Sequence, residues 1–168
     1  FITQPLPIGG VSIVVITVAA LTGTLKIGEA ISGFANTAIW LIVGAFLFSR
    51  GFIKTGLGKR IAYNLISAFG SSSLRLAYAL ALSDLILAPA TPSNTARVGG
   101  VIMPITTSLA KAFGSEPQDG PRKIGSFLMQ SIYQVNTITS AMFQTSMAGN
   151  TLVAALALQS FGIGITWG

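Results

Sequence analysis

Residues 89–97 read PATPSNTAR, a run of prolines and small polar side chains between two strongly apolar stretches, 74–88 and 98–113. Pro89 and Pro92 end a helix, because proline lacks an amide hydrogen and disfavours helical geometry in the residue before it. The stretch therefore predicts two helical arms joined by a non-helical tip.

The two arms are short for membrane-spanning helices. At about 15 to 16 residues each and about 1.5 Å per residue they reach about 24 Å, against a hydrocarbon core of about 30 Å. This length favours a re-entrant hairpin that enters the membrane from the cytoplasm and leaves on the same side. The alternative is a pair of full spans joined by an ordinary outside loop rich in turn-forming residues.

The composition places the chain in a membrane. Of its 168 residues 51% are hydrophobic and only 8% charged, and its mean hydropathy is +0.73, whereas soluble domains carry about 25% charged residues. The ten Lys and Arg residues are scattered over short connections, so they mark the cytoplasmic side rather than a nucleic-acid surface. The absence of Cys and His excludes disulfides, thiolate or imidazole metal sites and His-based catalysis. We therefore predict an all-α integral membrane protein that is not an enzyme.

The tip has the chemistry of a binding site. A non-helical segment at membrane depth must face protein or water, because unpaired backbone groups are too costly in lipid. Ser93, Asn94 or Thr95 can cap the second arm. Free carbonyls at the end of the first arm suit a cation such as sodium, and free N–H groups at the start of the second arm suit a carboxylate.

Two further spans precede the hairpin, at 5–22 and 34–53. The basic segment KTGLGKR at 54–60 marks the cytoplasmic end of the second span. Residues 61–69 have apolar positions at helical spacing but only about half the length of a span, so we expect them to lie in the membrane interface.

A second interruption follows the hairpin. Residues 124–145 form a span with many polar side chains, and SMAGN at 146–150 then breaks the pattern before apolar character resumes at 151–165. Asn150 ends this break, so we expect it at or near the site. Two breaks in one membrane protein can converge on one ligand.

Five other polar side chains lie within the apolar segments. Asp84 is either a proton or cation partner or, as we prefer, a structural partner of a neighbouring polar group. Arg97 either adds positive charge for an anion or extends to the interface. Gln134, Asn136 and Thr137 either line a substrate path or bond between helices, and we prefer the interhelical bond for Gln134 and Thr137.

Several stretches together resemble a known family. They are LPIGGVSI at 6–13, FANTAIWLIVGAF at 34–46, GFIKTGLGKRIAY at 51–63, ALSDLILAPATPSNTARVGGVIMPI at 81–105 and ITSAMFQTSMAGN at 138–150. In these residues the chain resembles the divalent anion/sodium symporter family, which includes citrate, succinate and tartrate carriers and 2-oxoglutarate/malate translocators. The resemblance covers nearly the whole chain, and the Ser-Asn-Thr tip is its most specific motif.

The resemblance implies a homodimer built from inverted repeats, each with a re-entrant hairpin, a Ser-Asn-Thr tip and a broken helix. This chain corresponds to the N-terminal half, and it is expected to be a piece of a longer protein. Asn94 and Thr95 are expected to meet a substrate carboxylate. The predicted substrate-binding residues are Ser93, Asn94, Thr95 and Asn150, and the predicted ligands of Na⁺, the coupling ion, are Pro89, Ser93, Asn94, Ser146 and Gly149.

The implied function is secondary active transport of di- or tricarboxylates of the succinate, malate, 2-oxoglutarate or citrate class, coupled to sodium and driven by an elevator-like movement. No second Ser-Asn-Thr motif occurs in these residues, so the other half of the site lies outside them. SMAGN also departs from the proline-rich break of sodium-coupled relatives. A sodium-independent dicarboxylate exchanger is therefore the alternative, ahead of a channel or a non-transporting subunit.

The predicted organisation has four segments in a bacterial inner membrane or a plastid inner envelope. They are scaffold helices at 1–53, an interfacial linker helix at 54–73, the re-entrant hairpin at 74–113 and a broken helix of the transport domain at 114–168.

Overall fold

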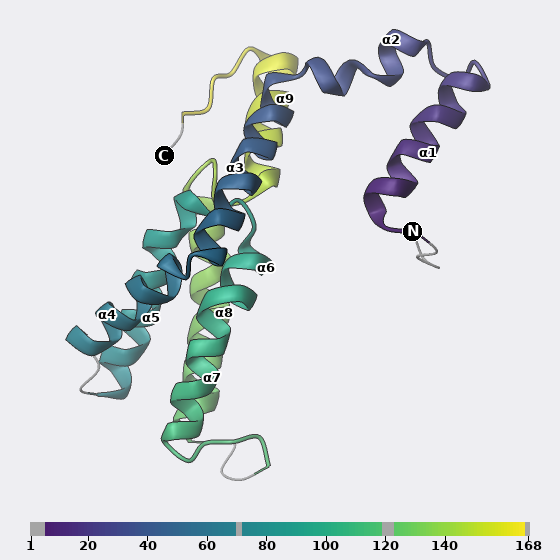
Figure 1. The fold of residues 1–168 in the computed structure, drawn as a ribbon. Helices are drawn as coiled ribbons and strands as arrows, with labels where there is room; N and C mark the ends of the chain where they lie inside the picture. Colours follow the sequence, from purple (N-terminus) through teal and green to yellow (C-terminus); the bar gives the residue numbers. More distant parts are fainter. Residues whose placement is uncertain (1–5, 70–71, 119–122, 167–168) are drawn as a thin grey trace. The chain divides into compact units, whose positions relative to one another are not determined.

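The computed structural model describes residues 6–69, 72–118 and 123–166, and these form helices and connections with no strand among them (Figure 1). The prediction of an all-α fold is confirmed. The elements are α1 (Ile8–Leu21), α2 (Ile27–Ala30), η1 (Ser32–Ala35), α3 (Thr37–Lys54), α4 (Leu57–Phe69), α5 (Ser73–Leu87), η2 (Ala88–Ala90), α6 (Asn94–Arg97), η3 (Val98–Ile102), α7 (Met103–Ala112), α8 (Ile124–Met142) and α9 (Ala148–Phe161).

Among the described residues, two helical stretches are long and apolar enough to cross a membrane. One is α3, and the other is α5 together with η2, from Ser73 to Ala90; α1 is apolar but shorter. Only Ser49 is buried in α3, while Leu47 and Phe48 are 69% and 61% exposed. A helix that leaves large apolar side chains uncovered is typical of a surface that lipid or further protein covers.

The chain divides into two compact units, Phe1–Trp40 and Leu41–Gly168. In the first unit, hydroxyl groups of α1 bond back along their own helix: Ser12 Oγ donates to Ile8 O at 2.9 Å and Thr17 Oγ1 to Ile13 O at 2.8 Å. The Trp40 indole N–H donates to Phe34 O at 2.6 Å. With their donors satisfied locally, these side chains are compatible with an apolar environment.

The second unit has a core made by α4, α5, η3, α7 and α8. Helix α4 packs on α5, α5 packs on α8, and α7 packs on α8. The buried core side chains are Ala62, Leu76, Leu80, Leu87, Val101, Ile102, Ile105, Leu128 and Ile132. This core fixes the two arms of the hairpin against α8.

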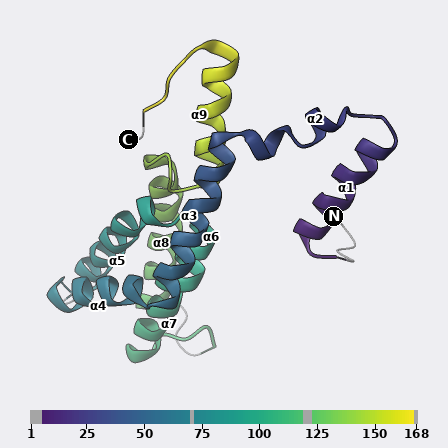
Figure 2. The same cartoon turned by 45° about the horizontal axis from the view of Figure 1, so that its top comes forward.

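The chain reverses direction between α5 and α6, as the prolines predict. In Figures 1 and 2 the start of α5 and the end of α7 lie toward the same side of the unit, and the tip lies at the other side. The second arm starts at Asn94 and continues through η3 and α7 to Ala112. The sequence did not predict that η3 is a π-helical turn. It precedes Pro104, which has no amide hydrogen for the carbonyl four residues earlier, and a widened turn accommodates that missing bond.

One predicted range is refined and another was wrong. Helix α4 spans Leu57–Phe69, inside the linker predicted at 54–73 but starting before the stretch 61–69, because Gly56 with φ +70° ends α3 and α4 follows at once. Helix α8 ends at Met142 and α9 begins at Ala148, so the second break lies at 143–147 and not at 146–150. Gly149 and Asn150 consequently belong to the first turn of α9.

The start of α8 tolerates no side chain at Gly125. A Cβ there would lie 2.8 Å from Ser115 Oγ and 3.2 Å from both Ala110 Cβ and Ser115 O. Gly125→Ala is therefore expected to destabilise the protein by about 1–3 kcal/mol through overpacking. Thermal unfolding of the detergent-solubilised full-length protein measures this. Gly51→Ala, where a Cβ meets nothing within 4 Å, is the matched control; equal melting temperatures for the two variants would contradict the packing described here.

Candidate functional site

The first break, at 88–93 between α5 and α6, lies against the second break, at 143–147, in the second unit. Thr145 Oγ1 donates to Pro89 O at 2.8 Å, and the Ala148 backbone N–H donates to Pro92 O at 3.0 Å. Carbonyls at the end of the first arm thus bond to the second break. The two breaks that the sequence identified are therefore in contact.

Arg97 is fully buried between the two breaks, with 0% of its side chain exposed. Its Nε donates to Asp84 Oδ1 at 2.8 Å. Nη1 donates to Thr91 O and to Ser146 O, each at 3.2 Å. Nη2 lies within hydrogen-bond distance of two hydroxyls of α8, those of Thr139 and Ser140, at 3.4 Å and 3.3 Å. All five N–H donors of a guanidinium therefore have acceptors.

Asp84 is the buried counter-charge, with 1% of its side chain exposed. Oδ1 accepts from Arg97, and Oδ2 accepts from the Asn136 amide at 3.3 Å and from the Thr139 hydroxyl. Both carboxylate oxygens are satisfied, as we expected of a structural Asp84. Both sequence interpretations of Arg97 need revision, because its guanidinium is neither free for an anion nor extended to the interface.

The ion pair and its hydrogen-bond partners join five segments of the chain. Asp84 belongs to α5 and Arg97 to α6, while their partners belong to the first break, α8 and the second break. A buried ion pair stabilises a fold only when hydrogen bonds satisfy its remaining atoms, and among the described residues no buried side-chain N or O atom lacks a partner. The pair therefore holds the two breaks in one fixed arrangement.

The second break is held by its own side chains. Ser146 Oγ lies 2.6 Å from Ser140 O and 2.8 Å from Phe143 O. Asn150 Nδ2 donates to the same two carbonyls, at 2.7 Å and 2.9 Å. These bonds satisfy carbonyls that the end of α8 leaves without helical partners, so the amide nitrogen of Asn150 is committed to the backbone.

The tip presents its polar side chains in a capped helix start. Ser93 Oγ accepts from the Ala96 N–H at 3.2 Å, which confirms it as a cap of the second arm. Asn94 Oδ1 accepts from the Thr95 N–H at 2.8 Å. Asn94 is half-buried and Thr95 is exposed. The Thr95 hydroxyl also donates to Asn94 Oδ1, at 3.4 Å, so the Asn94 Nδ2 group is the amide donor that remains at the tip.

The oxygens predicted to bind sodium already have partners. Pro89 O accepts from Thr145, Ser93 Oγ from Ala96 and Asn94 Oδ1 from Thr95. Pro89 O and Ser93 Oγ each keep a second lone pair for a cation, whereas Asn94 Oδ1 also accepts from the Thr95 hydroxyl, at 3.4 Å. However, a fixed cation, the Arg97 guanidinium, already lies between the carbonyls of the two breaks. Gly149 is the second residue of α9 and takes part in none of the side-chain hydrogen bonds of this cluster.

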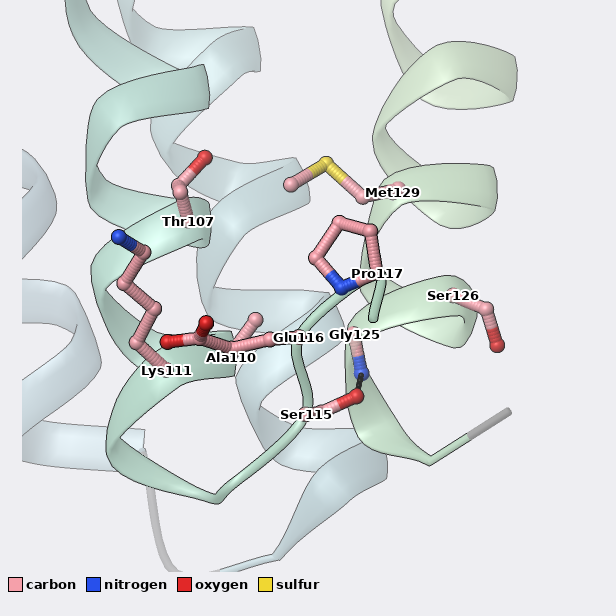
Figure 3. Close-up of a pocket in the computed structure, with 9 residues that line it drawn as sticks. All are labelled: Thr107, Ala110, Lys111, Ser115, Glu116, Pro117, Gly125, Ser126 and Met129. Carbon is pink, nitrogen blue, oxygen red and sulfur yellow. Dashed lines mark hydrogen bonds between the residues drawn. The ribbon is translucent and has the colours of Figure 1, made fainter. Parts of the chain in front are cut away.

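Besides a hollow of about 310 Å³ between α5 and α8, two further hollows lie in the described part of the second unit. One, of about 280 Å³, borders the second break and is lined by Ala141, Met142, Phe143, Gln144, Asn150, Ile165 and Thr166. The other, of about 370 Å³, lies between the end of α7 and the start of α8 and shares no residue with either break (Figure 3). Of the predicted site residues, only Asn150 lines a hollow among these two.

Sequence reasoning missed several residues of the cluster. Thr91 and Ser140 contribute carbonyl or hydroxyl acceptors for Arg97, and Thr145 bonds to the first arm. The sequence feature that could have identified this cluster is the pair of neighbouring hydroxyl residues, Thr139 and Ser140, shortly before the second break. Gln134 and Thr137 are exposed, and the Thr137 hydroxyl bonds to Tyr133 O within its own helix rather than between helices.

Comparison with known proteins identifies relatives over the whole chain. The family model described as the sodium:sulfate symporter transmembrane region matches residues 1–168. The chain is 56% identical over 168 residues to the Bacillus subtilis protein named "Putative malate transporter YflS", covering 99% of this chain and 35% of that protein. It is 49% identical over 167 residues to the spinach "Dicarboxylate transporter 1, chloroplastic", covering 99% and 29%.

A third relative has a named exchange activity. The chain is 46% identical over 140 residues to the "L-tartrate/succinate antiporter" of Escherichia coli, covering 83% of this chain and 29% of that protein. The chain thus spans about a third of the length of the relatives it matches.

Proposed function

The chain belongs to the divalent anion/sodium symporter family of membrane transporters, and from this premise we propose that it forms one half of the substrate site of a secondary carrier for di- and tricarboxylates. Relatives named for malate, for dicarboxylates and for tartrate and succinate support a dicarboxylate substrate. The observation that carries the proposal is the tip, where Asn94 Nδ2 and the Thr95 hydroxyl lie at the start of a helical arm. Such donors at a helix N-terminus suit a carboxylate.

The depth of the tip supports a re-entrant hairpin. Lys54, Lys59 and Arg60 are exposed, and charged side chains are too costly in hydrocarbon, so the corner between α3 and α4 is expected at the headgroups. Gly58 at this corner touches η3, since a Cβ on it would lie 3.3 Å from Val101 Cγ2. Ser93 precedes Val101 by eight residues, which is about 12 Å of helix. The tip is thus separated from this corner by about 12 Å of helix, which is consistent with a tip inside the hydrocarbon and away from the headgroups.

The rest of the proposed architecture follows from the family. The matching second tip lies outside these residues, in an inverted repeat of the full-length protein, and completes the site. The full-length protein forms a homodimer, and the hairpin moves with the broken helix α8–α9 as one transport body in an elevator mechanism. The bonds between the two breaks support a common movement of these elements.

Two coupling modes were expected, sodium symport and sodium-independent exchange, and the buried Arg97 favours exchange. Its guanidinium already supplies positive charge to the carbonyls of Thr91 and Ser146, the backbone groups that the broken helices would present to a coupling cation. A resident cation does not leave with the substrate. A carrier of this kind returns most readily when loaded with another dicarboxylate.

Uptake of labelled succinate into proteoliposomes distinguishes the two modes. For the full-length protein we expect uptake into vesicles preloaded with unlabelled malate and little uptake into empty vesicles, whether or not a sodium gradient is present. Uptake into empty vesicles that rises with an inward sodium gradient would instead support symport. No dicarboxylate uptake under either condition would contradict the carrier itself.

A further inference from the structure

The corner between α3 and α4 concentrates positive charge that the protein does not neutralise. Arg50, Lys54, Lys59 and Arg60 lie within three helical turns of sequence and are all exposed. Among the described residues none of these side chains has an ion-pair partner. Arg50 and Lys54 are four residues apart on α3, a spacing at which like charges repel on a helix surface.

The position of Lys59 and Arg60 at the start of their helix makes this excess of positive charge less favourable. Both lie in the first turn of α4, which begins at Leu57, where the helix dipole is positive and the first N–H groups have no helical acceptor. Basic side chains at that end are unfavourable, and an anion is favourable. The corner therefore lacks a negative group that its local structure would stabilise.

The surroundings of the charges are apolar on the same exposed surface. Gly58 and Ala62 are the buried face of α4, while Tyr63 and Leu57 are exposed to 54% and 43%. A basic cluster flanked by an exposed aromatic and an exposed aliphatic side chain matches both the headgroup and the upper acyl region of a lipid. Free phosphate would interact only with the charged side chains and not with the apolar ones.

We propose that the α3–α4 corner binds the phosphate headgroup of an anionic phospholipid, with Lys54, Lys59 and Arg60 as its main contacts. The lipid neutralises the corner and holds α4 at the membrane surface. Because Gly58 packs against Val101 of η3, the lipid also steadies the base of the hairpin's second arm.

Native mass spectrometry of the delipidated full-length protein, titrated with phosphatidylglycerol, tests this proposal. We expect wild-type protein to retain phosphatidylglycerol in preference to phosphatidylcholine. Each neutralised cation should weaken binding about five-fold, so Lys59→Gln with Arg60→Gln should cost about 25-fold. Lys59→Arg with Arg60→Lys keeps both charges and should retain binding, which separates loss of charge from misfolding.

The matched control is Lys26→Gln with Lys111→Gln, which removes the same charge at two other exposed positions and should leave phosphatidylglycerol binding unchanged. Equal binding by the control and by the Lys59/Arg60 double variant would overturn the proposal. Equal retention of phosphatidylcholine and phosphatidylglycerol would overturn it as well. Displacement of phosphatidylglycerol by inorganic phosphate alone would show a phosphate site in place of a lipid site.

Discussion

Replacing Arg97 with Leu is expected to have the largest effect on stability of any single substitution in this chain. It leaves Asp84, which is buried, without its charged partner, and removal of one member of a buried ion pair costs about 3–5 kcal/mol. It also removes the donor of the bonds to Thr91 O and Ser146 O that join the two breaks. Thermal unfolding of the purified protein measures this effect, and we expect a large fall in the melting temperature.

The double variant Asp84→Asn with Arg97→Gln is the informative comparison. It removes both charges but keeps polar atoms at each position, so it should be less destabilised than Arg97→Leu alone. Arg97→Lys should fall between wild type and Arg97→Leu, because an ammonium cannot reach five acceptors spread around a planar guanidinium. A double variant less stable than Arg97→Leu would show that the pair does not act as a unit.

Asn94→Ala is expected to have the largest effect on transport with little effect on stability. The Asn94 amide is half-buried, and its Nδ2 is a donor that the tip offers to a carboxylate. A hydrogen bond to a charged group is worth about 1.5–3 kcal/mol, so its loss should reduce uptake of labelled succinate about ten- to a hundred-fold.

Asn64→Ala provides the control for this substitution. Asn64 lies on the exposed face of α4, outside both breaks, and its replacement should leave uptake near the wild-type rate. Thr95→Ser, which keeps the second hydroxyl donor of the tip, should likewise keep most of the uptake. Unchanged uptake in Asn94→Ala would remove Asn94 from the site.

Local sequence signals predicted the turn between α5 and α6 because each acts through neighbouring backbone. Pro89 and Pro92 ended the first arm, and Ser93 capped the second through a bond three residues away. The second break was misplaced by three residues because its small residues looked irregular, whereas Asn150 Nδ2 bonds to Ser140 O and Phe143 O and so allows α9 to start at Ala148.

The buried ion pair was not predictable in the same way. Asp84 and Arg97 are separated by the whole tip, and their contact depends on how tightly the chain turns through η2 and the first break. The acceptors for Arg97 on α8 and beyond lie more than forty residues further along the chain. Such a network requires the packing of α5 against α8, which no local pattern encodes.

The central claim, that a dicarboxylate binds at the Ser-Asn-Thr tip, is tested most directly by ligand-induced stabilisation of the purified full-length protein. Saturating succinate at about 100 times its dissociation constant should stabilise the wild-type protein by about 2.7 kcal/mol, seen as a higher melting temperature. We expect the same shift for Asn64→Ala and little or none for Asn94→Ala at that concentration. An equal succinate-induced shift in Asn94→Ala and wild type, or no shift in wild type, would contradict the claim.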